Sequence, residues 1–133
     1  MATTISNDVK RILDKTVTVS AVTQLYHADS GTTYFLNAAA GVAITLPAVK
    51  AGVSFKFITA ASFITTAWTV TGGGAVIQGS IIVNGAKVAG ANETTITFAH
   101  AAETVGDHVE LQCDGTNWFL SGVADAAGGI TLA

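Results

Sequence analysis

Residues 108–119, His-Val-Glu-Leu-Gln-Cys-Asp-Gly-Thr-Asn-Trp-Phe, decide the fold class of this chain. Polar and apolar residues alternate from His108 to Cys113, as they do in a β-strand with one buried and one hydrated face. Asp114-Gly115 favours the positive φ values of a tight turn, so Trp118 begins a return strand. The stretch therefore predicts a β-hairpin with Cys113 and Trp118 in the core.

The same two-residue period recurs along most of the chain. Alternating or buried strands are predicted at 16–20, 34–36, 42–46, 53–57, 75–77, 80–83 and 95–98. Turn signals separate them at 37–41, 72–74, 84–85 and 90–92. Strands spaced about 8 to 12 residues apart are typical of a sandwich or a small barrel. We find no internal repeat, and we expect one all-β domain over residues 16–125, a jelly-roll-like β-sandwich or a small barrel.

The two ends of the chain differ from this body. Five of the fifteen charged residues lie within residues 8–15. Apolar residues at helical spacing, Ile5, Val9, Ile12 and Leu13, predict a short amphipathic helix at about 6–15 that forms a charged N-terminal arm over 1–15. Such a helix is too short to be stable alone, so its apolar face packs on the body or on another subunit. Residues 126–133 are expected to be a flexible tail, with 130–132 as a last short strand or an arm.

Composition excludes several classes of protein. Hydrophobic residues make up 50% of the 133 residues and charged residues only 11%, against about 25% in an average soluble domain. The polar surface must therefore come mainly from neutral polar residues, of which the 19 threonines are the most numerous. A net charge of −3 argues against nucleic acid and anionic lipid as partners. A surface with so little charge is easier to explain if an assembly covers much of it.

Membrane insertion and secretion are not expected. Residues 57–86 carry no charge, but they are interrupted by Gly72-Gly73-Gly74 and by hydroxyl residues, among them Thr59, Ser62, Thr65, Thr66, Thr69 and Thr71. A spanning helix needs about 20 predominantly apolar residues, and the uninterrupted apolar runs here are far shorter. The first residues lack a basic segment followed by an apolar run, so we expect synthesis in a cytosol without a signal peptide.

The titratable residues do not form a convincing reactive site. The histidines are His27, His100 and His108, and the last two could face each other across a hairpin, with Asp107 and Glu110 nearby. His108 shares a strand face with Glu110, however, which favours a hydrated surface over a zinc site. Cys113 shares its parity with apolar residues, and a buried cysteine is inert. We therefore predict no catalytic, metal or cofactor-binding residue, and we expect that the protein is not an enzyme.

Several segments resemble a known group of proteins. The order is Tyr34-Phe35-Leu36-Asn37, then Gly41 to Ala48 with its Thr-Leu-Pro, then Gly52 to Phe57, and finally Gly106 to Leu111 and Asp114 to Phe119. It resembles small β-rich virion proteins of tailed bacteriophages, among capsid decoration (cement) proteins and fibre or tail-tip modules. The resemblance covers about residues 34–122 and leaves out the predicted N-terminal helix.

This resemblance implies a structural protein, commonly trimeric and without a cofactor. We expect it to decorate the outer surface of the major capsid protein lattice, after synthesis in the cytoplasm of a bacterial host. The absence of a long shaft and the charged N-terminal segment favour decoration over a tail-fibre or tail-tip receptor module. We expect the arm to bind the partner through Ile5, Val9, Lys10, Arg11, Ile12, Leu13 and Lys15. The fibre alternative needs an exposed aromatic platform for glycan, for which Trp68 and Phe63 are the candidates.

Overall fold

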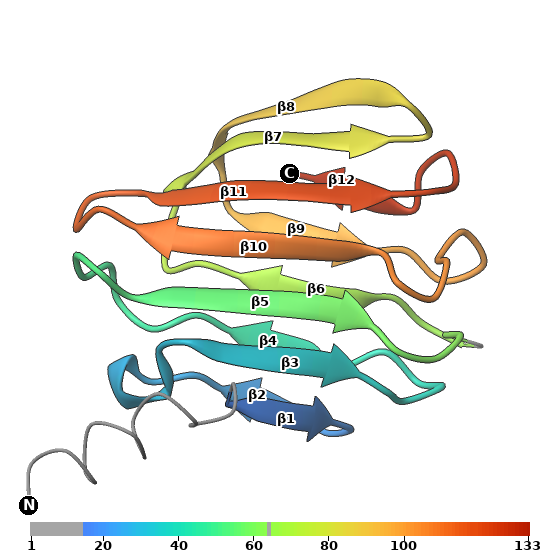
Figure 1. The fold of residues 1–133 in the computed structure, drawn as a ribbon, viewed down its shortest axis with the longest axis horizontal. Helices are drawn as coiled ribbons and strands as arrows, with labels where there is room; N and C mark the ends of the chain where they lie inside the picture. Colours follow the sequence, from blue (N-terminus) through green and yellow to red (C-terminus); the bar gives the residue numbers. More distant parts are fainter. Residues whose placement is uncertain (1–14, 64) are drawn as a thin grey trace, which may run out of the picture.

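The computed structural model describes residues 15–63 and 65–133, which form two packed β-sheets (Figure 1). The larger sheet has seven strands in the order β1-β3-β5-β10-β11-β7-β8, and the smaller has five in the order β12-β9-β6-β4-β2. The strands of the larger sheet are β1 (Thr16–Val19), β3 (Thr32–Leu36), β5 (Ser54–Thr59), β7 (Ile77–Val83), β8 (Ala86–Glu93), β10 (His108–Cys113) and β11 (Trp118–Ala124). The strands of the smaller sheet are β2 (Thr23–Gln24), β4 (Ala43–Thr45), β6 (Trp68–Thr71), β9 (Thr95–Phe98) and β12 (Ile130–Leu132), and one 3-10 turn, η1 (His27–Asp29), follows β2.

The first half of the chain winds as three stacked coils. β1, β3 and β5 lie parallel in the larger sheet, while β2, β4 and β6 lie parallel in the smaller one. Each coil thus contributes one strand to each sheet, in the manner of a β-solenoid. The coils begin at Thr16, Thr32 and Ser54, so their lengths are unequal. This inequality explains why parallel stacking leaves no repeat in the sequence.

The second half of the chain completes both sheets with antiparallel strands. The β10–β11 hairpin lies between β5 and β7, and its register places Cys113 opposite Trp118 as the sequence predicts. β7 pairs parallel with β11 and antiparallel with β8. In the smaller sheet β9 pairs antiparallel with β6 and β12. The two halves therefore meet along β5–β10 in one sheet and β6–β9 in the other.

The core lies between the sheets and is rich in aromatic residues. Trp68, Trp118, Phe57 and Phe98 are all fully buried. The rings of Tyr34 and Phe57 stack, with their centroids 5.4 Å apart. Every second residue of β3, β5 and β10 points into this layer, because successive side chains of a strand alternate between its faces.

The predicted all-β fold is confirmed, and several boundaries need correction. Residues 75–77 and 80–83 are predicted as two strands, yet a single strand, β7, runs from Ile77 to Val83; residues 75–76 lie outside it, and Gly79 within it takes a φ of +121°. Its position also excludes a side chain, because a Cβ there would lie 2.3 Å from the Leu120 carbonyl oxygen. Residues 90–92 are not a turn but part of β8, where a register shift accommodates the extra residue.

The predictions for the two ends of the chain have different outcomes. Within residues 126–133, expected to be a flexible tail, Ile130–Leu132 form β12, paired with β9, and Ile130 is buried. This segment thus adds an edge strand to the smaller sheet, one of the alternatives that the sequence left open. The predicted helix at 6–15 lies outside the described residues except for Lys15.

Candidate interaction surfaces

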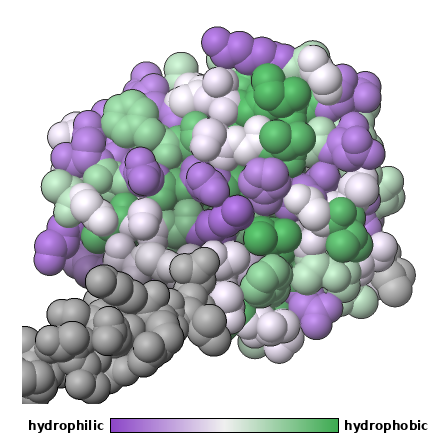
Figure 2. Space-filling model, in the orientation of Figure 1, coloured by the Kyte–Doolittle hydropathy of each residue, from purple (hydrophilic) through white to green (hydrophobic). Residues whose placement is uncertain are grey.

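One row of outward-facing side chains crosses the whole larger sheet. The strand registers align Thr18, Phe35, Ile58, His108, Val123, Ile82 and Lys87, one residue from each strand. We name its four apolar members, Phe35, Ile58, Val123 and Ile82, the apolar row. Val123 is 46% exposed and Ile82 42% exposed. Phe119, on the same face of β11, is 47% exposed. Figure 2 shows this face, with green apolar side chains lying among purple polar ones.

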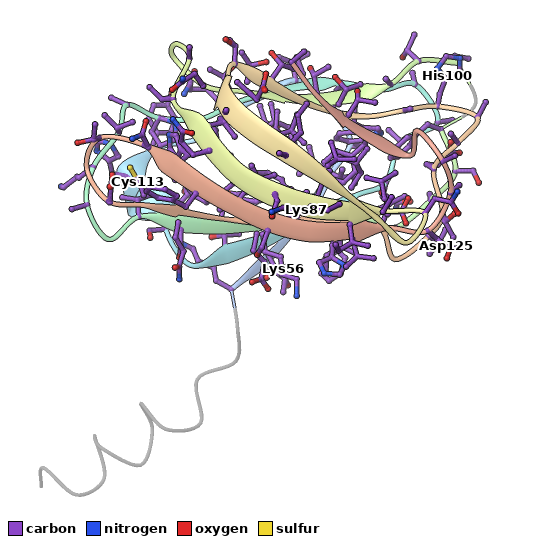
Figure 3. The ribbon with its side chains drawn as sticks, turned by 90° about the horizontal axis from the view of Figure 1, so that it is seen from above. Lys56, Lys87, His100, Cys113 and Asp125 are labelled. Atoms are coloured by element: carbon purple, nitrogen blue, oxygen red, sulfur yellow. The ribbon has the colours of Figure 1, made fainter. Side chains whose placement is uncertain are left out.

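Polar residues lie next to the apolar row on the same face. Lys56 and Glu110 are cross-strand partners, and their charged atoms lie 3.3 Å apart. Both side chains are well exposed, so this pair adds little to stability. A shallow hollow of about 180 Å³ lies beside the pair and is lined also by Thr33, Ser54 and Gln112. Figure 3 shows the sheets from above, with Lys56 and Lys87 on the outer side of the larger sheet.

The outer face of the smaller sheet has a different chemistry. Its outward residues form two rows, Gln24-Thr45-Thr71-Thr95 and Ala43-Thr69-Thr97-Thr131. We name the six threonines the threonine face. The five strands of this sheet contain no charged residue. The outer face of the smaller sheet therefore meets water through neutral hydroxyl groups, as the composition led us to expect.

A third surface lies at the end of the stack that is formed by the first coil. β1 and β2 are the edge strands of their sheets at this side of the molecule (Figure 1). We name the apolar side chains exposed here, Val17, Val22 and Tyr26, the open end; their exposures are 43%, 76% and 62%. Lys15, the described member of the predicted partner-binding set, donates a hydrogen bond from Nζ to the Ala28 carbonyl at 3.1 Å.

The candidate reactive residues do not converge. β9 and β10 belong to different sheets, so His100 and His108 do not face each other across a hairpin. His108 is half-buried beside exposed Glu110, as predicted, and its Nδ1 lies 3.1 Å from the Gly106 carbonyl. Asp107 is buried, and its carboxylate accepts hydrogen bonds from the backbone amides of Thr104 and Asp125. That carboxylate therefore holds two loops together, a role that the sequence did not reveal.

The proposed glycan platform is contradicted by burial. Trp68 is 0% exposed and Phe63 is 2% exposed, and their rings pack against each other with centroids 5.7 Å apart. The Trp68 indole N–H also donates to the Ala38 carbonyl. Both side chains belong to the core, because alternation in β6 directs Trp68 inward. Neither can present a stacking surface to a sugar.

Cys113 is buried, as its parity predicts. Its Sγ accepts weak hydrogen bonds from the amides of Lys50 and Gly115 at 3.3 and 3.4 Å. It lies at one end of the strands, while His100 and Asp125 lie at the other (Figure 3). Among residues 15–63 and 65–133, no three His, Cys, Asp or Glu side chains are grouped as metal ligands.

The turn between β10 and β11 contains a carboxylate with a perturbed pKa. The backbone amides of Asn117 and Thr116 both donate to Asp114 Oδ1 at 2.8 Å and lower the pKa of Asp114. Its contribution to stability is therefore full above the unfolded pKa of about 3.9 and is lost as pH falls through the folded pKa.

Replacing Asp114 with Asn keeps an acceptor oxygen but removes this titration. We expect chemical denaturation of wild type below about pH 4 to show a steeper loss of stability than that of Asp114→Asn, because only wild type must protonate Asp114. Equal slopes in the two proteins would contradict this explanation.

Comparison of the sequence with family models, and with curated proteins and solved structures, finds no match. Within the described residues, no helix has the length and apolar character to cross a membrane.

Sequence reasoning anticipated the alternating faces but missed all three surfaces. The apolar row joins residues from strands far apart in the chain, and only the registers bring Phe35, Ile58 and Val123 together. The threonine face had a local signal, since Thr69-Val70-Thr71 and Thr95-Ile96-Thr97 place two threonines on one side of a strand.

Proposed function

We propose that the protein is a non-enzymatic capsid decoration protein of a tailed bacteriophage. The observation that supports this most is the apolar row, which leaves Val123 and Ile82 exposed on the outer face of the larger sheet in a protein with little charge. Exposed apolar groups arranged on one face are suited to burial against another protein surface. In this proposal the outer face of the larger sheet binds the major capsid protein lattice, and the threonine face remains in water.

The area of the larger sheet limits how much contact this face alone can make with a capsid. Seven strands about 4.8 Å apart and about 18 Å long present on the order of 500 Å². A stable interface buries about 800 Å² of accessible surface per partner, so contact beyond this outline would strengthen binding. We propose that the N-terminal arm supplies further contact and that a homotrimer multiplies the binding through effective concentration. Contacts made only in the assembled shell then stabilise that shell by mass action.

The first test is the copy number of the chain per particle. Quantitative mass spectrometry of purified virions should find it in numbers comparable to the major capsid protein. A handful of copies per particle would instead indicate a tail or fibre component, although Trp68 and Phe63 are no longer candidates for its glycan site. Absence of the protein from particles would overturn both virion assignments.

A charge placed in the apolar row tests the binding face. We expect Val123→Glu to weaken binding to undecorated shells at least tenfold, about 1.4 kcal/mol, because the carboxylate would lose water on docking. Thr45→Glu, on the exposed surface of the threonine face, is the matched control and should bind as wild type. Sedimentation of shells with bound protein measures both. If the two variants bind equally, the larger sheet is not the binding face.

A further inference from the structure

His108 lies in the middle of the apolar row. The strand registers place it between Ile58 of β5 and Val123 of β11, and the other two members of the apolar row follow one strand further out on either side. The side chain of His108 is half-buried, like that of Ile58. Lys87, which ends this row on β8 (Figure 3), is separated from His108 by two apolar side chains. The proposed docking face thus has a titratable ring at its centre, with apolar neighbours on both sides.

The hydrogen bond of this ring decides where a proton is added. Nδ1 of His108 lies 3.1 Å from the carbonyl oxygen of Gly106. A carbonyl oxygen only accepts, so Nδ1 is the donor and carries the hydrogen of the neutral ring. Protonation therefore takes place at Nε2, the ring nitrogen farther from the backbone. Because His108 points outward from β10, the added charge lies on the side where a partner would dock.

The charged groups around His108 have other partners or lie beyond the row. On β5, Lys56 pairs with Glu110 of β10, and their charged atoms lie 3.3 Å apart. In the loop before β10, the buried carboxylate of Asp107 accepts hydrogen bonds from two backbone amides, one of them that of Asp125. β11 contains no charged residue, and Asp125 follows it as an exposed residue. Among the residues that the structure describes, His108 forms no ion pair.

We propose that protonation of His108 releases the outer face of the larger sheet from the major capsid protein, so that docking depends on pH. This inference rests on the proposed function, which makes that face the docking surface. A neutral imidazole between Ile58 and Val123 can be buried against an apolar partner surface at modest cost. An imidazolium would lose its water there, and burial of a charge is far more costly. Histidine side chains ordinarily change charge between about pH 5 and 8, which sets the range in which binding falls.

The experiment measures the binding of the full-length protein to undecorated shells by sedimentation at about pH 7.5 and about pH 5.5, within the range where histidine titrates. We expect wild type to bind at least fivefold more weakly at the lower pH. His108→Gln is neutral at both pH values and should change less than twofold between them. His108→Lys is charged at both and should bind weakly at both. Binding of wild type that is equal at the two pH values, or stronger at the lower one, would overturn the proposal.

Two controls distinguish His108 from other titrating groups. Titration of the shell itself affects every variant, so a pH dependence shared by wild type and His108→Gln would overturn the proposal. Glu110→Gln breaks the pair with Lys56 on the same face and should keep the pH dependence of wild type. Its disappearance in Glu110→Gln would assign the effect to that pair and overturn the role of His108. Thermal unfolding at both pH values should show that all variants are folded, because the ring of His108 is only half-buried.

Failure of the proposed function gives a different result. Wild type, His108→Gln and Glu110→Gln would then bind shells at neither pH while remaining folded, and both proposals would be overturned. Binding of wild type without pH dependence would keep the capsid as partner and reject only the role of His108.

Discussion

Replacing Trp118 with Ala should destabilise the protein by about 3–5 kcal/mol. Trp118 is fully buried at the start of β11, opposite Cys113, and its ring packs against Phe55 with centroids 5.7 Å apart. Truncation leaves a cavity where the hairpin meets β5 and β7. Because whole domains are stable by about 5–15 kcal/mol, this single change removes a large part of the total. Urea denaturation followed by circular dichroism measures it.

Two controls distinguish packing from other causes. Trp118→Phe keeps an aromatic ring and removes an indole N–H that has no hydrogen-bond partner in the described structure, so its cost should stay below about 1.5 kcal/mol. Phe119→Ala changes the neighbouring residue, which points to the outer face and is 47% exposed, and should cost under about 1 kcal/mol. A loss below about 1 kcal/mol for Trp118→Ala would show that Trp118 does not hold the core.

Replacing Asp107 with Ala should cost about 2–5 kcal/mol, because two partly buried backbone amides lose their acceptor at once. Oδ2 accepts from Thr104 at 2.9 Å, and Oδ1 accepts from Asp125 at 2.9 Å. The carboxylate thus joins the loop before β10 to the loop after β11. The backbone of Asp107 also accepts from the amide of Thr59, which ties both loops to the end of β5.

Asp107→Asn sharpens this prediction. The amide side chain offers one acceptor oxygen and turns its NH₂ group towards the second donor, so it should lose about 1–3 kcal/mol. Thermal and urea unfolding of the three proteins should rank wild type, Asn and Ala in decreasing stability. An Ala variant as stable as wild type would show that water replaces the carboxylate without cost.

The sequence predicts features that depend on neighbouring residues, such as strands and their buried faces. It does not predict how strands far apart in the chain pair with one another. Alternation in His108–Cys113 predicted the strand, the buried Cys113 and the half-hydrated His108, all of which are confirmed. It did not predict that β1 pairs parallel with β3, since alternation looks the same in parallel and antiparallel strands. The sequence makes Trp68 a candidate platform because aromatic residues serve both cores and binding sites, and only three-dimensional packing decides between them.

The candidate surfaces show the same division. The threonine face follows from alternation within β6 and β9, so the sequence contained its local signal. The apolar row depends on the pairing of β5 with β10 and of β11 with β7, which local patterns do not determine. In the sequence, Asp107 is one of several acidic residues near a histidine. Its role becomes visible only when two loops lie side by side and each donates a backbone amide to one of its carboxylate oxygens.

The order in which the strands are paired has a consequence for synthesis on the ribosome. β5 and β6 end the solenoid half, but their partners β10 and β9 come much later in the chain. Until those strands emerge, β5 and β6 are edge strands with unpaired backbone N–H and C=O groups. Such edges promote association between nascent chains. Pairings between distant segments also slow folding. Weaker induction, which lowers the concentration of such nascent chains, should therefore raise the soluble yield of this protein more than that of a β-protein built only from adjacent hairpins.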